Sequence, residues 1–174
     1  MPAHSSWQLI VATMQRTASF LHRDAEEELH RLRDDGSSSI VNYSRSAQMQ
    51  MVMVAVGGFS ILEGILEQTR GWAEPFNQMD RELRAKGLGA IADDFMNFRQ
   101  AVNVLKHGFG RSYEQLIQRD KLPFRVKKAD ENFFDEGDIA EIPGLVLVDK
   151  DFVLACSIMI EQVCEALEIP RLDI

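Results

Sequence analysis

Three polar side chains repeat at every fourth position near the middle of the chain: Arg99, Asn103 and His107. In an α-helix, residues four apart lie above one another, so the three form one polar stripe. An arginine can bind a phosphate through two parallel hydrogen bonds, and an imidazole can accept a proton near neutral pH. The stripe therefore combines a base with a cation that can bind a phosphate, and Asn103 can orient the bound group.

Two further charged residues accompany this stripe. Glu63 lies within the most apolar segment of the chain, where an unpaired carboxylate would be costly to bury. Lys106 faces the apolar side of the predicted helix, so its ammonium group must extend to water or pair with a carboxylate. We therefore expect Glu63 to meet Arg99, Lys106 or His107.

The same residues also have a purely structural interpretation. Lys106 and His107 fall in the last turn before Gly108, where the helix dipole favours cations and a glycine commonly ends the helix. Arg99 and Glu63 can form an ion pair that has no part in catalysis. The sequence leaves both interpretations open.

The segment that contains the stripe reads FRQAVNVLKHGFGRSY, from Phe98 to Tyr113. It resembles the motif helix of the HEPN superfamily (higher eukaryote and prokaryote nucleotide-binding helical domains), the small all-α domains of toxins, abortive-infection proteins and other RNA-cleaving systems. Those proteins carry an arginine that is followed, after four to six residues, by a histidine, commonly with an asparagine. In this chain seven residues separate Arg99 from His107.

The resemblance implies a HEPN-like protein of defence or toxin–antitoxin type, with Arg99, Asn103 and His107 as catalytic residues and Glu63 and Lys106 as supporting ones. It also implies a homodimer whose subunits together form a cleft for RNA, and an antitoxin as a further partner. The alternative is a non-catalytic module of the same fold, which serves dimerisation, nucleotide sensing or protein interaction. Neither function calls for a metal or a cofactor.

Carboxylates and histidines elsewhere in the chain are weaker candidates for a site. His22, Glu26 and His30 are spaced by four on the first predicted helix and could offer three metal ligands. We interpret them instead as part of a solvated, charged helix face. Asp93 and Asp94 suit the first turn of a helix, where acidic side chains are favoured by the dipole.

Basic and thiol side chains complete the set of candidates. Arg125, Lys127 and Lys128 form a small basic cluster, which could attract a phosphate but which we interpret as a solvated strand. Cys156 and Cys164 lie two helical turns apart, a separation of roughly 12 Å that is too long for a disulfide. We expect both thiols to be reduced and buried.

The elements that position these residues are mostly helices. Apolar residues at three- and four-residue spacing predict helices over residues 7–33, 43–70, 75–85, 90–107 and 113–119, and a last one from residue 149 or 151 to about 167. Gly57, Gly58 and Gly64 weaken the second helix by roughly 1 kcal/mol each relative to alanine, which either the close approach of a neighbouring helix or a kink would explain. We expect a mainly all-α fold, an antiparallel bundle of four to five main helices.

Residues 123–149 follow a different pattern. Phe124-Arg125-Val126 alternates, and residues 145–148 are a short β-type run after Pro143-Gly144. We therefore expect a small β-hairpin appended to the bundle. At 174 residues the chain fits one helical-bundle domain, 1–174, with the hairpin as an insert at 123–149.

The composition is that of an ordinary globular protein, with 45% hydrophobic and 26% charged residues. A formal net charge of −8 argues against a broad electrostatic surface for nucleic acid, although it leaves room for a small basic cleft. The first residues lack the basic start and apolar stretch of a signal peptide, and Glu63 interrupts the longest apolar segment. We expect no membrane-spanning helix and a cytoplasmic location.

Overall fold

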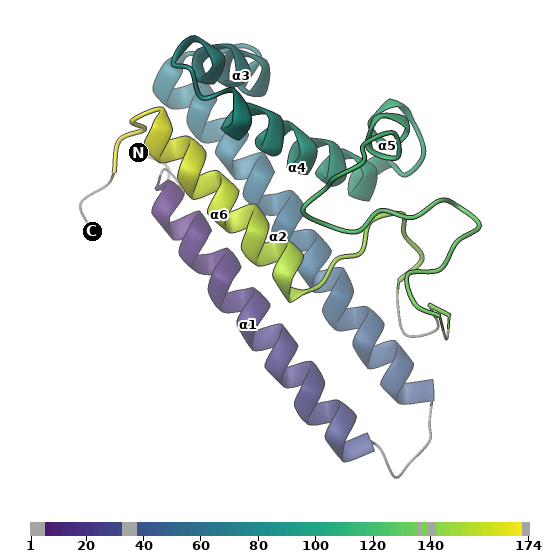
Figure 1. Ribbon diagram of the computed structural model, residues 1–174. Helices are drawn as coiled ribbons and strands as arrows, with labels where there is room; N and C mark the ends of the chain where they lie inside the picture. Colours follow the sequence, from purple (N-terminus) through teal and green to yellow (C-terminus); the bar gives the residue numbers. More distant parts are fainter. Residues whose placement is uncertain (1–5, 33–37, 136, 139–141, 172–174) are drawn as a thin grey trace.

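The computed structural model describes residues 6–32, 38–135, 137–138 and 142–171, and six helices lie within these ranges (Figure 1). They are α1 (Trp7–Leu32), α2 (Ser38–Arg70), α3 (Pro75–Ala85), α4 (Gly89–His107), α5 (Arg111–Leu116) and α6 (Lys150–Ala166). The predicted all-α fold is confirmed. The predicted bounds of α1, α3, α4 and α6 hold to within a residue or two, whereas α2 begins at Ser38 rather than residue 43 and α5 begins at Arg111 rather than residue 113.

The last helix, α6, lies at the centre of the bundle. It packs against α1, α2 and α4, and Figure 1 shows it, in yellow, between α1 and α4. Asp149 begins the helix, as predicted, because its carboxylate accepts a hydrogen bond of 2.8 Å from the backbone N–H of Phe152. Beyond the end of α6, the carbonyl of Ile169 accepts a hydrogen bond of 3.3 Å from the indole N–H of Trp7, so the start of α1 is joined to the segment that follows α6.

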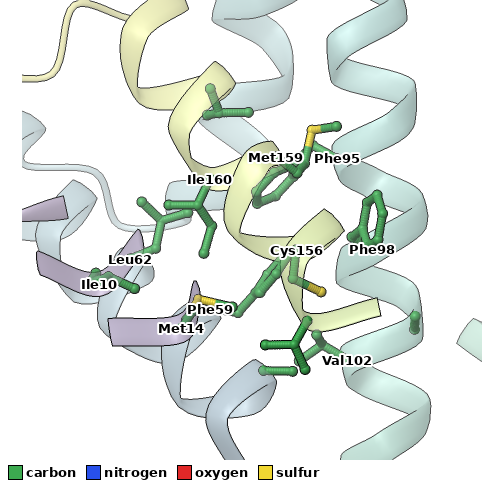
Figure 2. Close-up of a cluster of buried hydrophobic side chains, with 14 of the residues drawn as sticks. Ile10, Met14, Phe59, Leu62, Phe95, Phe98, Val102, Cys156, Met159 and Ile160 are labelled. Atoms are coloured by element: carbon green, nitrogen blue, oxygen red, sulfur yellow. The ribbon is translucent and has the colours of Figure 1, made fainter. Parts of the chain in front are cut away.

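Aromatic rings connect α4 to the rest of the core. Phe59 of α2 stacks on Phe95 of α4 with ring centroids 5.3 Å apart, and Phe76 of α3 lies 5.2 Å from Phe95. A second group of rings lies further along α4 and consists of Phe98, Phe124 and Phe152. Figure 2 shows Phe59, Phe95 and Phe98 among the apolar side chains of α6. This packing fixes one face of α4 inward and so determines which of its residues reach solvent.

The two cysteines are free and buried in α6, as the sequence predicts. Burial raises the pKa of both thiols, and for Cys164 it does so to about 12, with a further contribution from the charge of Glu165. Both are therefore protonated at neutral pH, and we assign them to the core.

The glycines of α2 have different surroundings. A methyl group at Gly58 would lie 2.5 Å from the sulfur of Met14, so this glycine lets α1 approach closely, as expected. A methyl group at Gly57 or Gly64 would have no neighbour within 4 Å among the described residues. Close approach of α1 therefore explains only Gly58, and α2 remains helical through all three glycines.

The same helix has the length and hydropathy of a membrane-spanning segment. The stretch Val41–Arg70 reaches a mean hydropathy of 1.7, and 44% of its most apolar part is buried inside the fold. Glu63 does not lower the hydropathy below that of a span, so, contrary to the expectation from the sequence, this residue does not exclude one. Buried core helices of soluble proteins have the same composition, and length and hydropathy alone do not separate the two.

The predicted β-hairpin does not form in the described part of residues 123–149. One isolated antiparallel bridge joins Val126 to Val146, with backbone hydrogen bonds of 3.0 Å on either side of it. A two-stranded ladder alone is marginally stable, and here side chains hold the segment instead. Lys127 pairs with Asp138, and Arg125 donates to the carbonyl of Phe133.

Alanine substitutions should separate the two kinds of glycine in α2. Gly64→Ala should raise the free energy of unfolding by about 0.5–1 kcal/mol, because alanine favours the helix and its methyl group meets nothing. Gly58→Ala should be less stable than Gly64→Ala, because the new methyl group must displace the buried side chain of Met14. Urea denaturation followed by circular dichroism measures both. Equal stabilisation by the two would show that Met14 places no constraint on residue 58.

Candidate functional site

The end of α4 and the start of α5 are held close together by a short glycine-containing turn. Gly108 ends α4 with a φ of 71°, a conformation that glycine adopts without strain, and its N–H donates to the carbonyl of Val104 at 2.8 Å. Gly110 also has a positive φ, and α5 begins at the next residue. The turn therefore brings the first side chains of α5 back toward the last turn of α4.

A solvent-open hollow of about 250 Å³ lies at this junction, which we call the α4–α5 hollow. Its polar lining comes from Asn103, His107, Arg111 and Ser112. His107 and Arg111 are exposed, and Asn103 and Ser112 are half-buried. The structure thus brings together two of the three residues of the predicted stripe, because both lie on the side of α4 that faces away from the core.

Arg99 does not line the α4–α5 hollow. Its guanidinium donates a hydrogen bond of 2.8 Å to the side-chain oxygen of Asn77 and lies 5.3 Å from the centre of the Phe76 ring. Both partners belong to α3. The half-buried Arg99 side chain is therefore directed toward α3 and helps to hold that helix on α4, while Asn103 and His107 face α5.

The expected contacts of Glu63 and Lys106 are not formed. Glu63 is half-buried and has no hydrogen bond or ion pair with any residue that the structure describes. The buried face of α2 passes through Phe59, Leu62 and Leu66, so Glu63 lies at the edge of that face, where its carboxylate reaches water. Lys106 is exposed rather than directed toward the core, because it lies in the last turn of α4, where the apolar packing ends.

Sequence reasoning missed Arg111 as a site residue. A residue four positions after His107 would continue the stripe if the helix went on, but Gly108 ends the helix. The chain then turns over two glycines and returns, so Arg111 shares the hollow with His107 after all. The signal in the sequence was the pair of glycines on either side of Phe109, which predicts a tight turn rather than an open loop.

Other candidates from the sequence have structural contacts. Asp93 lies beyond the first turn of α4, contrary to the expectation, and its carboxylate pairs with Arg84 at 2.6 Å. Arg125 stacks on the rings of Phe133 and Phe134. Of the basic cluster, Lys128 pairs with Glu131 at 3.8 Å and is exposed, as a solvated residue would be.

Metal ligands do not gather anywhere in the part of the chain that the structure describes, since no three histidine, cysteine or acidic side chains lie together there. His22 and Glu26 lie 3.4 Å apart and exposed on α1, as neighbours one turn apart on a solvated face. The described side chains therefore offer no cluster of three such ligands.

These groups are suited to an anion. The hollow presents one guanidinium, one imidazole, one amide and one hydroxyl, and no carboxylate lines it. Guanidinium and imidazolium groups donate hydrogen bonds to phosphate oxygens, and the neutral imidazole can also accept a proton. Comparisons with protein-family models, curated proteins and solved structures found no match for this chain.

Substitution of the two arginines should separate a structural role from a site role. Arg99→Ala should lower the free energy of unfolding by about 1–2 kcal/mol, since it removes a cation–π contact and a hydrogen bond from the packing of α3. Arg111→Ala should change it by less than about 0.5 kcal/mol, because the side chain is exposed. Chemical denaturation compares the two variants. A larger loss for Arg111 would indicate that this residue serves the fold.

Proposed function

We propose that this chain is a HEPN-like protein of defence or toxin–antitoxin type, an endoribonuclease that cleaves RNA without a metal. The observation that carries the proposal is the α4–α5 hollow, in which His107, Arg111 and Asn103 share one solvent-open recess free of carboxylates. A phosphodiester with its 2′-hydroxyl is the ligand that uses all three groups.

The reaction assigns one task to each side chain. His107 removes the proton of a ribose 2′-hydroxyl, whose oxygen then attacks the adjacent phosphorus. The 5′ oxygen of the next nucleotide leaves and takes up a proton from solvent, so the products are a 2′,3′-cyclic phosphate and a 5′-hydroxyl. Arg111 holds the non-bridging oxygens as charge develops on them. Asn103 orients the phosphate or the ribose.

In this proposal Arg111 takes the task that the sequence pattern gave to Arg99. Arg99 lies with α3, so its contribution is to position α4 rather than to touch the phosphate. Lys106 adds a positive charge to the same last turn of α4. Glu63, which has no polar partner among the described residues, has no assigned task in the reaction.

The second candidate function is a non-catalytic module of the same fold, which senses a nucleotide or binds a partner protein such as an antitoxin. The engagement of Arg99 with α3 favours it, because one member of the predicted catalytic pair then belongs to the packing of the bundle. In that case the hollow binds a phosphate and leaves the bond intact.

The cleavage assay compares four variants on a fluorescent single-stranded RNA in the presence of a metal chelator. His107→Ala and Arg111→Ala should each lower the rate at least about 100-fold, because they remove the base and the phosphate contact. Arg99→Ala should keep the rate within a few-fold at a temperature where it is folded. His22→Ala, which changes a half-buried histidine of α1 outside the hollow, is the matched control and should match the wild type.

The outcomes separate the two functions. If Arg99→Ala lost cleavage and Arg111→Ala retained it, the phosphate contact would belong to Arg99, as the sequence pattern predicted. That result would exclude the hollow as the site. A wild-type protein that binds RNA without cleaving it, and whose expression does not slow bacterial growth, would make the non-catalytic module the better account.

We also propose that the protein is a homodimer and that α2 takes part in the interface. Several large apolar side chains of α1 and α2 remain exposed, namely Leu9, Met49, Met53 and Ile61. Three of them line a shallow apolar groove of about 420 Å³ between the two helices. Gly57 lies in the same groove with open space in front of it, so a helix of a second copy could approach closely there. Because its proposed substrate is RNA, we also propose that the dimer lies in the cytoplasm and does not associate with a membrane.

Light scattering after gel filtration should report a species of twice 19.7 kDa at micromolar concentration. Met53→Glu should shift it to the monomer, because a carboxylate on the exposed methionine would be buried in the interface. Gln68→Glu, which adds the same charge at an exposed site near the end of α2, is the control. A wild-type monomer would contradict the homodimer.

A further inference from the structure

A second polar hollow lies between α3, α4 and the segment that follows α5. It measures about 390 Å³, and we call it the arginine hollow because three arginines are part of its lining: Arg81, Arg84 and Arg119. Asp80, Asp93 and Gln100 also line it. None of these residues belongs to the α4–α5 hollow, and the proposed function gives them no task.

One arginine and both carboxylates satisfy one another. Arg84 contacts Asp80 at 3.1 Å and Asp93 at 2.6 Å, so it joins α3 to the N-terminal part of α4. This cluster has a structural task and carries a formal charge of about −1 by itself. It does not account for the other two arginines of the hollow.

Arg81 and Arg119 are the unexplained members. Both side chains are exposed, and neither has a hydrogen bond or an ion pair with a residue that the structure describes. They come from different elements, one from α3 and the other from the segment after α5. Two guanidinium groups without a partner among the described residues thus line the same hollow, in a protein whose net charge is −8. Each has five donors arranged to bind phosphate oxygens.

The arginine hollow is linked to the α4–α5 hollow by α5. Gln100, which lines the arginine hollow, donates a hydrogen bond of 2.7 Å to Gln115 of α5, while Arg111 of the same helix lines the other hollow. The six residues of α5 rise by about 9 Å, and Arg119 lies three residues beyond the end of the helix. A single nucleic-acid strand covers such a distance with a few nucleotides.

We propose that the arginine hollow is a second phosphate subsite, which binds the backbone of an RNA strand a few nucleotides away from the bond held in the α4–α5 hollow. The inference rests on the proposed function for its ligand, since RNA is the polyanion that would occupy both hollows at once. The strand runs along α5, with Arg111 at one end and Arg81 and Arg119 at the other.

Binding of a single-stranded RNA whose 2′-oxygens are all methylated tests the subsite, because this probe cannot be cleaved. Fluorescence anisotropy of a labelled twelve-nucleotide probe is measured over a range of salt concentrations. Arg81→Gln with Arg119→Gln should weaken binding at least about tenfold, the effect of a lost charged hydrogen bond. It should also make the negative slope of log K against log salt shallower by about 0.7, the value for one phosphate of a single strand.

The matched control is Arg16→Gln with Arg23→Gln, which removes the same charge from two exposed positions of α1. It should bind the probe as the wild type does, with an unchanged slope. Equal affinity and slope in the wild type and the Arg81 and Arg119 double variant would overturn the subsite. Equal losses in both double variants would overturn it as well, because they would show a general effect of charge.

Two further outcomes separate the subsite from the nuclease and from a small anion. If the wild-type protein bound the probe through Arg81 and Arg119 but did not cleave RNA, the proposed function would be contradicted and the subsite would be supported. Cleavage whose KM is unchanged by the double substitution would keep the function and overturn the subsite. Calorimetric binding of inorganic phosphate at these arginines, without binding of the probe, would assign the hollow to a free anion and overturn the proposal for RNA.

Discussion

Burial of α6 is the constraint on which the rest of the structure depends. This helix is apolar on most sides, and its side chains at Cys156, Ile160 and Val163 are inaccessible to solvent. It can be covered only if α1, α2 and α4 all pack around it, which they do. Each of those helices then has one face committed to the core, and their remaining faces carry whatever function the protein has.

The position of α4 shows how that constraint reaches the candidate site. Phe95 and Phe98 anchor one face of α4 among the rings of α2, α3 and α6. Asn103 and His107 lie on the other side of the helix, so they are held at the surface by packing in which they take no part. The Gly108 turn then adds Arg111 from α5. Rigid helices thus hold side chains that are themselves free to meet a ligand.

Local signals in the sequence were sufficient for most of the helices. The bounds of α3 follow from Pro75 at its first turn and from Lys86 and Gly87 at its end, and these are properties of a few neighbouring residues. The same holds for Asp149 at the start of α6. The prediction of a hairpin was wrong because two β-type runs are necessary for a ladder but not sufficient. Side-chain contacts, such as that of Lys127 with Asp138, determine the path of the chain instead.

The site was harder to predict than the fold because its geometry depends on non-local contacts. A helical wheel placed Arg99, Asn103 and His107 on one stripe, but it could not show that Asn77 and Phe76 of α3 would bind the arginine. Nor could it show that Glu63 would lie at the edge of the packed face of α2. Arg111 was not predicted because the turn that brings it back to His107 interrupts the helical periodicity on which a wheel depends.

The hydrogen bond between Trp7 and Ile169 has a consequence for the synthesis of the protein. The two residues leave the ribosome far apart in time: at the usual rate of elongation, on the order of ten seconds or more separates them. Until α6 has emerged, α1 can pair with α2 alone, and the sides of both helices that α6 will cover remain open to water. The nascent chain therefore passes through a state in which part of its future core is exposed and chaperones would bind it, and α1 reaches its full packing only after α6 has emerged.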